Sequence, residues 1–95
     1  MSPISVVLPR MLAADAGGSR TLTVDVGDAG TVGDVLDELA ARYPLLGRRL
    51  RDETGTLRRF VNVYVEGEDI RRASGDRTTV RAGQEVLIIQ SVAGG

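Results

Sequence analysis

The chain has 95 residues, of which 42% are hydrophobic and 26% charged, and its formal net charge at pH 7 is -1. This length suffices for one compact domain, and the near-neutral charge gives no reason to expect a nucleic-acid partner. The sequence contains neither Cys nor His, which excludes disulfides and thiol or imidazole catalysis and removes the usual zinc ligands, so we expect no bound metal.

The N-terminal residues lack the basic start and the apolar core of a signal peptide. No apolar run approaches the length that spans a membrane. We therefore expect a cytoplasmic protein with no membrane partner.

Two strands are predicted in the first part of the chain. Residues 4–8 form a β-branched run, and residues 20–26 alternate, with Leu22, Val24 and Val26 on one face. The segment between them is rich in Gly and small residues, which is typical of a hairpin-type connection. We expect the two strands to pair antiparallel.

A helix is the clearest single element of the sequence. Thr31 and Asp34 match a capping box, and apolar residues follow at helical spacing as far as Tyr43. Pro44 should end this helix or force a new turn, because the residue before a proline is pushed out of helical geometry. The leucines of residues 45–50 predict a short second helical turn.

An arginine-rich segment follows at residues 47–59, which we call the Arg segment. It carries five Arg against one Asp and one Glu. Two interpretations stay open: a solvated loop, or a docking patch for an acidic partner. Nucleic acid is the less favoured partner, because the positive charge is not interleaved with aromatic residues.

Residues 60–65 give the strongest strand signal, with three valines on one face and Phe60, Asn62 and Tyr64 on the other. Residues 66–69 then turn the chain, and Ile70 is expected in a short strand. Residues 82–84 form another turn before a last strand at residues 85–90, which leads directly into the closing SVAGG.

The predicted order is two strands, a helix, a helical turn and three strands, which indicates an α+β fold with one main helix on one side of the sheet. That helix should cover the valine face of residues 60–65. Phe60 and Tyr64 would then point to the other side, joined by Leu87 and Ile89 of the last strand. An apolar patch with an aromatic near its middle is typical of a docking surface. The alternative is that the Arg segment covers Phe60 and Tyr64.

The ββαβ order together with AGQEVLIIQSVAGG resembles the ubiquitin-like β-grasp sulfur carriers of the MoaD/ThiS group, over nearly the whole chain. The stretch RRFVNVYVEGEDIR and the VAGG terminus are more specifically similar to the CysO-type carriers. The resemblance implies a β-grasp domain at residues 1–91, with a mixed sheet of four to five strands and one main helix packed on one face. Residues 92–95 would form a flexible C-terminal Gly-Gly tail.

For function, the resemblance implies that the Gly95 carboxylate is adenylated with ATP by a separate E1-like enzyme and converted to a thiocarboxylate that donates sulfur. Val92, Ala93 and Gly94 would thread a narrow channel toward that active site, where glycine allows close backbone approach. The chain would be a protein co-substrate, not an enzyme, and would bind no cofactor itself.

The resemblance favours cysteine synthesis from O-phosphoserine, with a cysteine synthase that depends on pyridoxal phosphate (PLP) as the sulfur acceptor and a JAMM-type zinc protease releasing cysteine afterwards. Sulfur donation to molybdopterin, to thiamin or to a secondary metabolite stays open. So do a ubiquitin-like modifier attached to target lysines and a plain β-grasp interaction module. One departure concerns Gln90 and Ser91, where many relatives have proline; without proline the last strand can run further.

Overall fold

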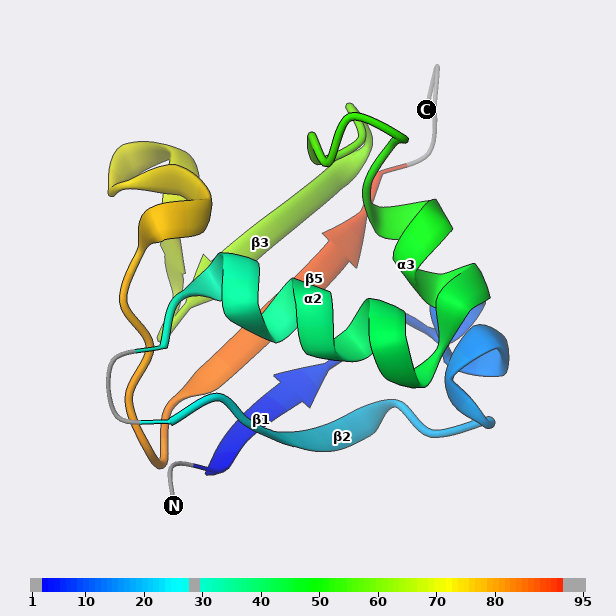
Figure 1. Ribbon diagram of the computed structural model, residues 1–95, viewed down its shortest axis with the longest axis horizontal. Helices are drawn as coiled ribbons and strands as arrows, with labels where there is room; N and C mark the ends of the chain where they lie inside the picture. The colour runs from blue at the N-terminus through cyan, green and yellow to red at the C-terminus, as the bar shows by residue number, and fades with distance from the viewer. Residues whose placement is uncertain (1–2, 28–29, 92–95) are drawn as a thin grey trace.

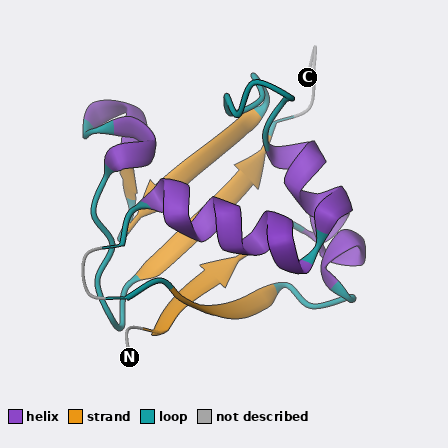
Figure 2. Ribbon diagram, in the orientation of Figure 1, coloured by secondary structure: helices purple, strands orange, loops and turns teal. Residues whose placement is uncertain are grey.

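A five-stranded sheet with helices against one face forms the fold (Figures 1 and 2). The structure is a computed structural model that describes residues 3–27 and 30–91. The elements run in the order β1 (Pro3–Val7), α1 (Arg10–Ala13), η1 (Ala14–Ala16), β2 (Thr21–Asp25), α2 (Val32–Arg42), α3 (Pro44–Leu50), β3 (Val61–Val65), β4 (Glu68–Asp69), η2 (Ile70–Arg72), η3 (Gly75–Arg77) and β5 (Glu85–Gln90), where η denotes a 3-10 turn.

The strands lie side by side in the order β2-β1-β5-β3-β4. The first two strands pair antiparallel, as the sequence predicts. The last strand, β5, lies parallel to β1 and antiparallel to β3, so it occupies the centre of a mixed sheet. β5 has register partners in both neighbours at Val86 and Leu87, and from Ile88 to Gln90 its register partners are in β3 alone.

The main helix α2 crosses one face of the sheet (Figure 1). Its capping box is complete: the Asp34 backbone N–H donates to the Thr31 hydroxyl at 3.2 Å, and the Thr31 N–H donates to the Asp34 carboxylate at 3.0 Å. α3 begins at Pro44, which suits the first position of a helix. Gly47 lets α3 pack closely on α2, because a Cβ there would lie 2.6 Å from the Cβ of Ala40.

Alternation along the strands decides which face is the core. Val61, Val63 and Val65 of β3 are buried, as are Val86 and Ile88 of β5. They pack under the apolar stripe of α2, which is buried at Val32, Val35, Leu36 and Leu39. The expected assignment of the valine face to the helix side is confirmed.

Two expectations for local structure were wrong. The connection after β1 is more than a hairpin loop, because α1 and η1 form there and bury Leu12 and Ala16. Ile70 is not in a strand: β4 ends at Asp69, whose carboxylate accepts the Arg71 backbone N–H at 2.9 Å and so starts the turn η2 at Ile70. Ile70 is nevertheless buried.

Candidate functional site at the end of β5

The end of β5 lies against the turn that precedes β3, at the same end of the sheet (Figure 1). Gln90 pairs with Val61, and the Ser91 backbone N–H donates to the Phe60 carbonyl at 2.8 Å. The strand thus ends at Gln90, and its hydrogen bonding continues to Ser91, as expected for a chain without proline here. Phe60 lies one residue before β3 rather than within it.

The residues predicted to react and to thread a channel lie beyond this point. Val92, Ala93, Gly94 and Gly95 are outside the described residues. Their roles stay predictions, as does the division of the chain into a domain at 1–91 and a tail at 92–95.

The face of the sheet opposite α2, which we call the open face, carries the outward side chains of β3 and β5. Tyr64 lies opposite Leu87 in the register, and Asn62 lies opposite Ile89. Tyr64 and Leu87 are half-buried, whereas Phe60 and Ile89 keep 40% and 39% of their surface exposed. Four large apolar side chains on two paired strands and the turn before them therefore remain partly open to solvent.

Four polar side chains form a hydrogen-bonded row that reaches the end of β5: Asp69, Arg71, Asn62 and Ser91. We call this row the relay. The Asn62 side-chain amide donates to the Ser91 hydroxyl at 3.1 Å, and its oxygen accepts from the Arg71 guanidinium. Arg71 is in turn paired with Asp69 at 3.2 Å. The hydrogen bonds from the Arg71 backbone N–H and then from its side chain hold the pKa of Asp69 below its ordinary value.

Sequence reasoning missed the relay. Asn62 alternates with valines in an apolar strand, and this is the one signal for it that the sequence offers. Ser91 is 29 positions away and Arg71 is 9 positions away, so only the strand register brings them together.

The Arg segment is largely tied to the chain itself. Arg49 pairs with Asp15 at 2.6 Å, Arg51 pairs with Asp37 at 2.7 Å, and the Arg58 side chain donates to a backbone carbonyl of α3 at 2.6 Å. These contacts favour a structural role for three of the five arginines. The alternative, a docking patch, stays a prediction.

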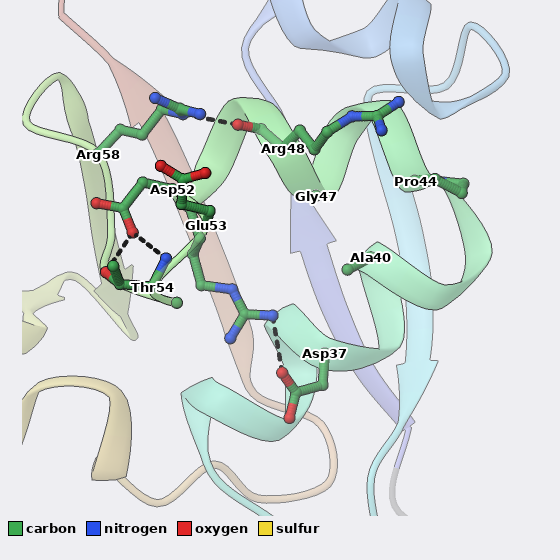
Figure 3. A pocket seen from close by; sticks show the side chains of 11 residues that line it. Asp37, Ala40, Pro44, Gly47, Arg48, Asp52, Glu53, Thr54 and Arg58 are labelled. Carbon is green, nitrogen blue, oxygen red and sulfur yellow. Dashed lines mark hydrogen bonds and ion pairs between the residues drawn. The ribbon is translucent and has the colours of Figure 1, made fainter.

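A depression of about 750 Å³ lies between α2, α3 and the loop that follows (Figure 3). Three arginines and three acidic residues line it, so its formal charge is balanced. The Asp52 carboxylate accepts from the Thr54 hydroxyl at 2.6 Å and from the backbone N–H groups of Thr54 and Thr56. The Thr54 hydroxyl is the main cause that lowers the pKa of Asp52, so this carboxylate acts as the cap of the loop.

Within residues 3–27 and 30–91, no cluster of three or more acidic side chains is arranged to hold a metal ion. In the same part of the chain, no helix has the length and apolar character needed to cross a membrane.

Comparison with known proteins identifies relatives along the full sequence. The model of the ThiS family matches residues 14–95. The sulfur carrier protein CysO of Mycobacterium tuberculosis is 38% identical over 94 residues, which cover 97% of this chain and 98% of the relative. Small archaeal modifier protein 1 of Haloferax volcanii is 40% identical over 82 residues, which cover 86% of this chain and 90% of the relative.

Solved structures of these two relatives and of a CysO complex from a third organism share the fold. The crystal structure of M. tuberculosis CysO has a TM-score of 0.82 at 36% identity and covers 94% of this chain and 99% of that one. The modifier protein from H. volcanii has a TM-score of 0.84 at 35% identity and covers 99% and 100%. A chain of the Amycolatopsis orientalis BexX/CysO complex has a TM-score of 0.81 at 35% identity and covers 97% and 99%.

The sheet order and the single main helix match those of ubiquitin-like β-grasp proteins, which confirms the expected fold class. The relatives are sulfur carrier and modifier proteins rather than catalysts, and the chain groups with these non-enzyme proteins. The chain belongs to the ThiS family of ubiquitin-like sulfur carriers.

Proposed function

We propose that the chain carries sulfur as a thiocarboxylate on Gly95. The observation that supports this most is the similarity to the CysO sulfur carrier over 97% of the chain, combined with a sequence that ends in Gly94 and Gly95. The end of β5 is paired with β3 as far as Gln90, and Ser91 is hydrogen-bonded to Phe60, so the described chain ends at a paired position.

The proposed chemistry takes two stages on a separate E1-like enzyme. The Gly95 carboxylate attacks the α-phosphorus of ATP and releases pyrophosphate, which leaves an acyl-adenylate. Sulfide attacks the acyl carbon and displaces AMP, which leaves the thiocarboxylate directly. A protein persulfide instead displaces AMP to give an acyl disulfide, and a second thiol then attacks the sulfur of that protein, which forms a disulfide and releases the thiocarboxylate. The chain has no Cys that could capture its own activated end. Because activation consumes ATP, we place the reaction in the cytoplasm.

The open face supplies the surface by which the activating enzyme would hold the domain. A few terminal residues bury too little area for recognition, since a specific interface takes about 800 Å² from each partner. Phe60, Tyr64, Leu87 and Ile89 form an apolar patch beside the end of β5. One relative is known in a BexX/CysO complex, which supports a protein partner for this chain.

The favoured acceptor of the sulfur is a PLP-dependent cysteine synthase acting with O-phosphoserine, followed by a JAMM-type zinc protease. The CysO similarity supports this acceptor over molybdopterin, thiamin or a secondary metabolite. Incubating the thiocarboxylated protein with such a synthase and O-phosphoserine should add one cysteinyl residue to Gly95. If no cysteinyl adduct forms, the acceptor lies in another pathway.

A second candidate function is protein modification, favoured by the 40% identity to small archaeal modifier protein 1. Both functions require the activated Gly95 carboxylate. They differ in the nucleophile that attacks it, which is a sulfur species for the carrier and a target lysine amine for the modifier. The intact mass of the protein recovered from cells that activate it separates them. Replacement of one oxygen by sulfur supports the carrier, a ladder of larger conjugates supports the modifier, and an unchanged mass contradicts both.

A further inference from the structure

Ser91 is held at two points where the chain leaves the sheet. Its backbone N–H donates to the Phe60 carbonyl at 2.8 Å, and its hydroxyl accepts from the Asn62 amide at 3.1 Å. Terminal rungs of a sheet fray when one hydrogen bond alone holds them. The contact with Asn62 therefore adds a second tether at the position where fraying would begin.

The other members of the relay fix which way the Asn62 amide faces. An amide side chain has an acceptor end and a donor end, and the Arg71 guanidinium occupies the acceptor. The donor end is thereby directed at Ser91. The Asp69 carboxylate holds Arg71 in place: it accepts from the Arg71 backbone N–H at 2.9 Å and from the Arg71 guanidinium at 3.3 and 3.2 Å.

The tether matters because Gly95, the residue that the proposed function assigns to the reaction, is close to Ser91 in the sequence. Four residues come after Ser91, and four residues span at most about 14 Å when fully extended. The position of Ser91 therefore limits the reach of the carboxyl group that the proposed function assigns to Gly95. Moving or loosening Ser91 changes where the carboxyl can reach, and catalysis is sensitive to misplacement of about 1 Å.

We propose that Asn62 is a positioning residue for activation of the C-terminal carboxylate. Acting through Ser91, and oriented by Arg71 and Asp69, it fixes the point from which the last four residues leave the sheet. This inference rests on the proposed sulfur-carrier function. It assigns Asn62 a role distinct from that of the apolar patch: the patch holds the domain on the enzyme, and the relay places the terminus.

The two roles predict different kinetic signatures in ATP–pyrophosphate exchange with the E1-like enzyme: loss of docking raises the KM for the carrier, and loss of positioning lowers kcat. Asn62→Ala should lower kcat at saturating carrier about two- to tenfold, the equilibrium equivalent of one hydrogen bond. Because Asn62 lies opposite Ile89 on the open face, the KM of this variant is expected to rise as well, and the drop in kcat is the signature of the positioning role. Ser91→Ala should have the same effect. If Asn62 acts through Ser91, the double variant should be no slower than either single variant. Ser5→Ala is the matched control, because Ser5 is an outward serine of β1 away from the relay.

A second measurement uses the isolated protein and needs no enzyme. Amide hydrogen exchange of Ser91, followed by NMR, should accelerate about two- to tenfold in Asn62→Ala and stay unchanged in Ser5→Ala. Unchanged exchange at Ser91, or a further loss of kcat when Asn62→Ala is added to Ser91→Ala, overturns the positioning role. A wild-type chain that is never adenylated overturns the proposed function itself, and the two failures are thereby told apart.

Discussion

Replacing Phe60 with Ala should weaken docking on the activating enzyme without unfolding the domain. A Phe side chain offers about 200 Å² for burial, and 40% of the Phe60 surface is exposed in the free protein. An interface that covers the exposed part removes about 80 Å² from water, worth about 2 kcal/mol. The KM for the carrier should therefore rise by up to about 30-fold.

The assay is ATP–pyrophosphate exchange with the carrier concentration varied at saturating ATP. We expect kcat to stay near the wild-type value, because the substitution removes a docking side chain and keeps the Phe60 backbone carbonyl that accepts from Ser91. Ile89→Asp places a charge in the same patch and should raise the KM as well. Leu45→Ala is the control: Leu45 is 46% exposed but lies in α3, on the helix side of the sheet.

Urea unfolding separates docking from stability in these variants. Phe60 and Ile89 lie outside the buried core, so both variants should stay folded at the assay temperature. If both are folded and neither changes the KM, the open face is not the docking surface. If the KM rises equally in the Leu45→Ala variant, the loss of exposed apolar area on either side of the sheet has the same effect. That result also refutes the open face as the docking surface.

Three further predictions concern the end of the chain, the helix contact and the capped loop. Deleting Gly95 should abolish thiocarboxylate formation, seen by intact mass, and leave the free energy of unfolding unchanged, because the residue lies beyond β5. Gly47→Ala should destabilise the fold by about 1–3 kcal/mol in urea unfolding, since the new methyl group would meet Ala40 at 2.6 Å. Thr54→Ala should raise the pKa of Asp52 toward its ordinary value, measured by NMR titration of the carboxyl carbon. Because the pKa of Asp52 is lower in the folded protein, its contribution to stability is present above about pH 4 and is lost as the pH falls through the folded pKa.

Local patterns in the sequence carried enough information for most of the fold. The alternation of residues 60–65 identified both faces of β3, and the capping box at Thr31 placed the start of α2. Short elements escaped because four residues show no period: α1 spans only Arg10–Ala13. Ile70 was predicted in a strand because it is apolar. It is buried, but the Asp69 carboxylate accepts from the Arg71 backbone N–H and starts a 3-10 turn at Ile70.

One part of the candidate site could be predicted from the sequence and the other could not. The apolar patch could be predicted from alternation, because side chains of paired strands that point away from a helix share a face. The relay could not, because it depends on the register that sets Asn62 beside the end of β5. The ion pairs of the Arg segment were equally hidden, since Asp15 and Asp37 lie far from their arginines in the sequence.

Carrier and modifier place the same demand on the fold, namely a terminus that starts from a fixed point beside a docking surface. The difference between them must therefore arise from the nucleophile that meets the activated carboxylate. The chain contains no Lys and no Cys, so no side-chain amine or thiol of a second copy competes for that carboxylate. The amino terminus is then the one amine that another copy offers, and under the proposed function the acceptor protein that supplies sulfur or a target amine decides the outcome.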